Sequence, residues 1–132
     1  MSRIVLVVSL GFAALCAWTA PSRASFVFAG EGLARNCYLI AEYGYGTGSK
    51  EVTPLDVCDA ALAETIDTEA RAGTLVNRFI VKLRMGLTAG AVTDCRTAVR
   101  IAPNMGEAHA NLGISLMKQG KFDEALPALN KG

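Results

Sequence analysis

Apolar residues recur at helical spacing through most of the chain, with polar residues between them. Leu112, Leu116 and Met117 form one apolar stripe in the stretch 104–129. Lys118 falls on the other side of the same helix. A spacing of three and four residues is typical of an amphipathic helix, since 3.6 residues make one turn. The pattern therefore predicts an all-α chain.

Capping residues divide the stretch 104–129 into two short helices. Asn104 is expected to accept a backbone N–H at the start of the first helix, and Glu107 stands where a capping-box acid belongs. Gly120 supplies a left-handed residue that ends this helix. The second helix begins near Asp123, whose charge suits the positive end of the helix dipole. Because the turn between them is short, the two helices are expected to fold back antiparallel.

The same pattern occurs once more, at a constant offset earlier in the chain. Gly113 and Ala125 are small residues that let the two helices of the later hairpin approach closely. In the earlier copy, Arg78, Phe79 and Lys82 replace the expected apolar or small residues, so its first helix is a degenerate copy. The identical pairs at this offset are Asn77/Asn111, Ile80/Ile114, Gly86/Gly120 and Ala91/Ala125.

This spacing resembles the tetratricopeptide repeat, a helix–turn–helix unit of about 34 residues. With Gly106 as the first position, Gly113 and Ala125 occupy the family's two small-residue positions, and Pro103 falls where the preceding repeat commonly ends with Pro. The resemblance covers residues 54–132, and residues 33–53 only by analogy. It implies a short right-handed superhelix of about three antiparallel helix pairs, the first irregular, which bury their core by stacking on one another.

In such a stack the first helix of each pair lines a concave groove, and the resemblance implies which side chains face it. An Asn side chain offers both a donor and an acceptor, which suits the backbone of an extended peptide. Two Asn in register resemble the asparagine ladder of peptide-binding members of the family; the alternative is that they bond their own helix or solvent. Two cations on this wall are expected either to attract an acidic group or C-terminal carboxylate or to form a solvated face. The groove residues are Val76, Asn77, Ile80, Arg84, Asn111, Ile114, Met117 and Lys118.

Residues 1–24 have the pattern of a cleaved export signal. Arg3 precedes an apolar run over residues 4–17, and Ser22 and Ala24 place small residues at the two positions before a cleavage site. The run is shorter than the roughly 20 residues of a spanning helix, which disfavours an uncleaved anchor. We expect cleavage after Ala24 and a periplasmic or secreted protein. Residues 25–53 then form an N-terminal segment with one helix, over Leu33–Tyr43, and a Gly-rich loop.

An exported chain is expected to hold disulfides. Cys37 lies on the predicted helix Leu33–Tyr43, and Cys58 on a second predicted helix, Pro54–Thr65. The loop between these helices lets them pack antiparallel, so a Cys37–Cys58 bond is expected; the alternative is two reduced core thiols. Cys95 occupies an apolar position of its repeat and is expected to be a buried free thiol.

Charge and chemistry exclude several functions. Removing Arg3 and Arg23 from the 13 basic side chains leaves 11 against 12 acidic ones. No basic face predicts binding to nucleic acid or, after signal cleavage, to a membrane. The glycines of the loop at residues 44–50 lack the spacing of a phosphate-binding loop. His109 is the single His and is expected to pack between helices, which leaves no nucleophile–base pair and no metal site, so we expect neither an enzyme nor a cofactor.

These observations predict an exported, non-catalytic scaffold that binds a protein or extended peptide. It resembles small exported tetratricopeptide proteins of Gram-negative bacteria. The alternative is a structural subunit of a larger envelope assembly, or a homodimer, formed through the edge of the last helix. Gly132 falls at position 27 of its repeat, so we expect either a fragment, which we favour, or an edge on which Phe122, Leu126 and Leu129 meet another chain.

Overall fold

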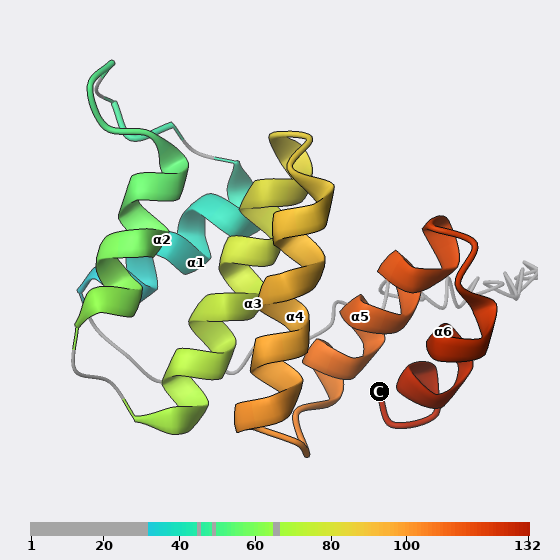
Figure 1. Cartoon of the computed structure of the whole chain (residues 1–132). Coiled ribbons are helices and arrows are strands. Elements are labelled where there is room, and N and C mark those ends of the chain that lie inside the picture. The colour runs from blue at the N-terminus through green and yellow to red at the C-terminus, as the bar shows by residue number, and fades with distance from the viewer. Residues whose placement is uncertain (1–31, 45, 49, 65–66) are drawn as a thin grey trace, which may run out of the picture.

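A computed structural model describes residues 32–44, 46–48, 50–64 and 67–132. All the secondary structure in these residues is helical, which confirms the all-α class (Figure 1). The predicted export signal, residues 1–24, lies outside the described residues. The helices are α1 (Leu33–Tyr43), α2 (Pro54–Ala63), α3 (Thr68–Arg84), α4 (Thr88–Ile101), α5 (Gly106–Lys118) and α6 (Phe122–Leu129).

Local side-chain bonds fix where α2 and α3 begin. The Thr53 hydroxyl accepts the Asp56 N–H at 3.2 Å, while the Asp56 carboxylate accepts the Thr53 N–H at 2.7 Å, a complete capping box before Pro54. The Thr53 N–H, and then the Thr53 hydroxyl, which also donates to the Asp56 carboxylate at 2.7 Å, lower the pKa of Asp56. At α3, the Asp67 carboxylate accepts the N–H groups of two following residues at 2.9 and 2.8 Å. The predicted second helix is shorter than expected, since Glu64 is already extended.

The predicted cap of α5 is wrong. The helix begins at Gly106, after Met105, and no side chain caps it. The N–H of Met105 bonds to the carbonyl of Ala102 at 3.1 Å. Asn104 is therefore held inside a tight turn, where it does not reach the first N–H groups of the helix.

The hairpin α3–α4 recurs in α5–α6 at the offset found in the sequence. Gly86 and Gly120 both take the left-handed conformation, with φ of 77° and 73°. The residue after each glycine closes the same bond back into the preceding helix, Leu87 N–H to Lys82 and Lys121 N–H to Leu116, both at 2.9 Å. These six-residue closures are Schellman caps. The periodicity in the sequence thus appears in the backbone.

Small residues set the distance between α5 and α6, as predicted. A Cβ placed on Gly113 would lie 2.5 Å from Cγ of Leu129 and 3.2 Å from the carbonyl of Ala125. No side chain larger than hydrogen fits there unless the Leu129 side chain or α6 shifts. Gly113 therefore allows the close packing of this hairpin.

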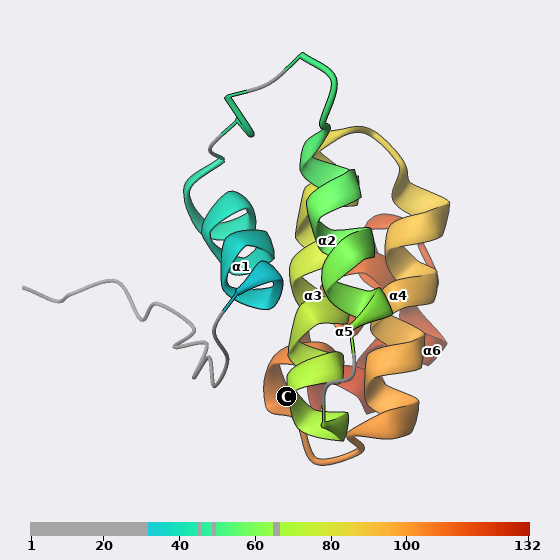
Figure 2. The ribbon, with the colours of Figure 1, turned by 90° about the vertical axis from the view of Figure 1, so that its left-hand side faces the viewer.

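The helices form successive pairs, α1 with α2, α3 with α4 and α5 with α6, that lie side by side in chain order (Figures 1 and 2). Helix α3 is central, since it contacts α1, α2, α4 and α5. Apolar clusters join each pair to the next. One contains Leu62 of α2, Val76 of α3 and Ala108 of α5, and another joins Phe79 and Cys95 to α5 and α6.

Helix α1 is fastened at two points. Its Cys37 is bonded to Cys58 of α2, with the sulfur atoms 2.07 Å apart, as the sequence predicted. Near its other end, the Arg84 guanidinium of α3 donates to the Ile40 carbonyl at 2.9 Å. The disulfide is compatible with an oxidising location.

Candidate binding site

A cavity of about 500 Å³ lies where α3 begins, α4 ends and α5 begins, at the lower end of the molecule in Figure 1. Its walls come from residues far apart in the sequence, residues 68–77 of α3 and residues 101–107 at the α4–α5 turn. Among the side chains lining it are Glu69, Asn77, Ile101, Met105 and Glu107.

Asn77 is the unusual residue of this cavity. It is only 2% exposed. Among the described residues, none forms a hydrogen bond with its side-chain amide. Yet no side-chain nitrogen or oxygen in that part of the chain is both sealed from solvent and unpaired, so the amide of Asn77 must open into the cavity that the residue lines. Water in the cavity can pair with this amide, and a ligand group that enters the cavity would take the place of that water.

Three helix ends border the cavity, the starts of α3 and α5 and the end of α4. The first turn of α5, at Gly106 and Glu107, carries no side-chain cap. The last turn of α4 contributes Ile101. His109 is buried, as predicted, and holds the turn between these helices, because its Nε2–H donates to the Pro103 carbonyl at 2.8 Å. This bond ties the α4–α5 turn, which borders the cavity, to α5.

The first-hairpin residues predicted to line a groove mostly have other positions. Val76 is completely buried in the apolar cluster between α2, α4 and α5, so the prediction that it faces a groove is wrong. Its side chain follows the stripe of α3 that packs onto neighbouring helices. Ile80 is partly buried against two clusters. Arg84 donates to the carbonyls at the end of α1. Of this group, Asn77 alone lines the cavity.

The second-hairpin residues are more open. Ile114 and Met117 of α5 are 48% and 46% exposed, and Lys118 is also exposed. Asn111 is partly buried and is not part of the cavity wall. Asn77 and Asn111 therefore do not both line this cavity.

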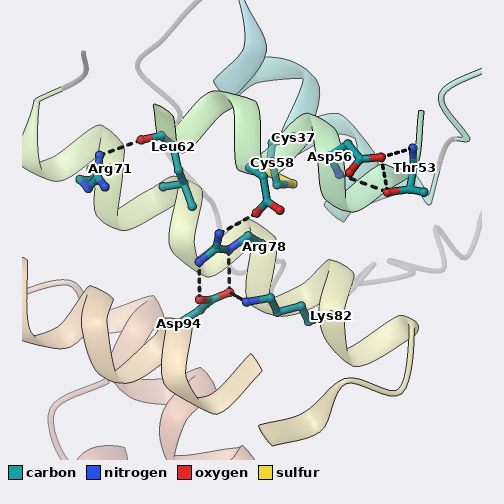
Figure 3. A network of polar contacts seen from close by, with 10 residues as sticks. Cys37, Thr53, Asp56, Cys58, Leu62, Arg71, Arg78, Lys82 and Asp94 are labelled. Atoms are coloured by element: carbon teal, nitrogen blue, oxygen red, sulfur yellow. Dashed lines mark hydrogen bonds and ion pairs between the residues drawn. A yellow bond between two sulfur atoms is a disulfide. The ribbon is translucent and has the colours of Figure 1, made fainter. Parts of the chain in front are cut away.

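Sequence reasoning missed a cluster of ion pairs between α2, α3 and α4 (Figure 3). The almost entirely buried carboxylate of Asp94 binds NH2 of Arg78 at 2.7 Å and Nζ of Lys82 at 2.8 Å. NH1 of Arg78 also binds Asp59 of α2 at 2.6 Å. Burial alone lowers the pKa of Arg78, but its bonds to Asp94 and Asp59 outweigh burial, so the pKa is raised.

The sequence held a signal for this cluster. The positions one repeat after Arg78, Lys82 and Asp94 are Leu112, Leu116 and Ala128, all buried apolar residues. Opposite charges at three positions that are apolar in the next hairpin indicate an internal ion cluster. The charged groups of this cluster pair with one another, so we interpret the cluster as structural.

The described residues offer few other reactive groups. Cys95 is a buried free thiol, as predicted; burial and the nearby charge of Asp94 raise its pKa to about 12. In the described ranges, His, Cys, Asp and Glu nowhere form a group of three or more arranged for a metal ion. None of the helices found there is long and apolar enough to cross a membrane.

A scan against protein-family models, a search of curated proteins and a search of solved structures each returned no match to this chain.

Proposed function

We propose that this protein is an exported, non-catalytic scaffold of the tetratricopeptide type that binds an extended segment of another polypeptide. The observation that carries the proposal is the repetition of one helical hairpin, with the same glycine turn at Gly86 and Gly120 and the same cap. The interval between the two turns is characteristic of the repeat, and proteins built from such repeats present extended binding surfaces.

The cavity supports the peptide ligand. It is lined by α4 and by the first helices of two successive pairs, α3 and α5, and presents the Asn77 amide, which bonds to no described residue. A peptide backbone supplies both the donor and the acceptor that an Asn side chain pairs with. The Cys37–Cys58 bond supports a periplasmic or secreted location.

Selection from a random peptide library tests this function. The full-length protein is immobilised and offered displayed peptides; we expect an enriched set whose binding protects the amides of residues 104–107 from hydrogen exchange. Replacement of Asn77 by Ala should weaken these peptides about tenfold, whereas Asn130→Ala, an exposed site at the end of α6, should leave them unchanged. A library with no enriched sequence over the blank surface contradicts the proposal.

A second candidate function, a structural subunit, is favoured by the face of the α5–α6 hairpin. Ile114, Met117 and Leu126 are 48%, 46% and 62% exposed. Their counterparts one repeat earlier, Ile80, Leu83 and Val92, belong to the core cluster that α5 and α6 complete. The last hairpin thus exposes the surface that the preceding one buries.

Sedimentation distinguishes the two candidates. A structural subunit should associate through this face, and Leu126→Lys should abolish the association while Arg35→Lys, on exposed α1 surface, should not. A chain that stays monomeric up to about 0.2 mM argues against this second function.

A further inference from the structure

We infer that the cavity between α3, α4 and α5 binds a Lys or Arg side chain of the partner polypeptide. The inference rests on the proposed peptide-binding function and names the chemistry that the cavity selects.

The charges of the cavity wall favour a cation. Glu69 and Glu107 both line it, and the lining residues that the structure describes include no Lys, Arg or His. The nearest basic residue on the first turns of α3, Arg71, donates to the Leu62 carbonyl at 2.8 Å and points to α2. Two carboxylates without a basic neighbour in the wall attract a positive group that enters between them.

The helix ends do not reverse this preference. The uncapped start of α5 carries about half a positive charge, which by itself favours an anion. The end of α4 lines the same cavity with about half a negative charge. The start of α3, at Thr68 and Glu69, also lines the cavity and adds about half a positive charge. The three helix ends together leave about half a positive charge, against the two full negative charges of Glu69 and Glu107.

The shape and the polar atoms fit a long basic side chain. The apolar side of the cavity consists of Ile101, Ala102 and Met105, against which a methylene stem packs. The oxygen of the unpaired Asn77 amide is an acceptor for the charged head group. A cavity of about 500 Å³ holds such a side chain together with part of its backbone.

Small cationic probes test the site without a known partner. We expect N-acetyl-arginine amide and N-acetyl-lysine amide, titrated into the labelled full-length protein, to shift the side-chain NH₂ signal of Asn77 and the backbone signals of Gly106 and Glu107 in a saturable manner. N-acetyl-norleucine amide, which keeps the stem without the charge, should bind at least about fivefold more weakly.

Variants of the wall supply the controls. Glu69→Gln combined with Glu107→Gln should weaken the arginine probe about tenfold, and salt raised from about 0.05 M to about 0.5 M should do likewise. Asp123→Asn, an exposed acid at the start of α6, should change nothing. Replacement of Asn77 by Asp, of nearly equal size, should strengthen binding.

Three results would overturn the inference: equal binding of the norleucine and arginine probes, stronger binding of N-acetyl-glutamate amide, or no shift at the cavity with any cation. Each is separable from a failure of the proposed function. If library peptides are enriched without a basic residue, and bind the double Gln variant unchanged, the function stands and the basic pocket does not.

Discussion

Gly113 leaves no room for a methyl group, since a Cβ there would lie 2.5 Å from the side chain of Leu129. We expect Gly113→Ala to lower the free energy of unfolding by about 1–3 kcal/mol, because the Leu129 side chain or α6 must shift. Gly73→Ala is the matched control, since a Cβ at this position in α3 meets nothing within 4 Å. Urea unfolding followed by circular dichroism should show a gain of up to about 1 kcal/mol for the control. An equal effect of both substitutions would contradict the close packing.

Cys95 should be almost inert while the protein is folded. Burial and the nearby Asp94 raise the pKa of its thiol from the ordinary value of 9.0 to about 12, so the reactive thiolate is scarce at neutral pH. At pH 8 we expect alkylation of Cys95, identified by peptide mapping, to be at least about a hundredfold slower in the native protein than in urea. Alkylation of the native protein at a rate close to that in urea would show that the site around Cys95 opens to solvent.

The raised pKa of Cys95 also makes the stability of the protein decline with pH in the alkaline range. Between about pH 9 and about pH 12 the unfolded chain loses this proton and the folded chain keeps it. The Cys95 thiol therefore makes its full contribution to the free energy of unfolding below its ordinary pKa. This contribution declines as pH rises through that window. Cys95→Ala should remove this part of the alkaline decline in urea unfolding, and an unchanged pH profile would assign the decline to other groups.

At the scale of elements, the disulfide attaches α1 to the rest of the molecule. Cys37 and Cys58 are separated by 21 residues, and closing a loop of that length stabilises the native state by about 3 kcal/mol in the chain-entropy treatment. The double replacement Cys37→Ser, Cys58→Ser should show a loss of this size in thermal or urea unfolding. We expect hydrogen exchange to become faster first in α1, while α5 and α6 keep their protection.

The ion pairs of Arg78, Lys82 and Asp94 allow a test of how α3 and α4 are held together. Asp94→Ala leaves Arg78 and Lys82 without their shared carboxylate, and we expect a loss of about 3 kcal/mol. The triple replacement Arg78→Leu, Lys82→Leu, Asp94→Ala copies the residues of the next hairpin and should restore most of that stability. Urea unfolding of both variants measures this. If the triple variant is no more stable than Asp94→Ala, the two unpaired charges alone do not account for the loss of stability.

The hairpin pattern made much of this arrangement predictable. Gly86 and Gly120 marked both turns, and the helix Leu33–Tyr43 was found with its observed bounds. The start of α5 was wrong because a local turn at residues 102–105 competes with an Asn cap. Periodicity also could not show that Arg78 and Lys82 point into an interface, since a charged residue in a degenerate repeat is equally consistent with a solvated face.

At the scale of the whole molecule, the candidate site was harder to foresee. Asn77 was selected from its repeat position, yet the cavity it lines also needs the first turn of α3 and the α4–α5 turn. These segments come together only when successive pairs pack. Val76, its neighbour in sequence, was misplaced for the same reason, because burial depends on α2, α4 and α5 together.

The charged cluster also distinguishes the two hairpins from each other. The face of α3–α4 that meets α2 requires the carboxylate of Asp59, while the corresponding face of α5–α6 carries Leu112 and meets an apolar surface. Exchanging the hairpins, or docking one onto a copy of itself, would set charges against hydrocarbon. Such an arrangement would cost free energy, so the charged cluster favours the observed order of the hairpins.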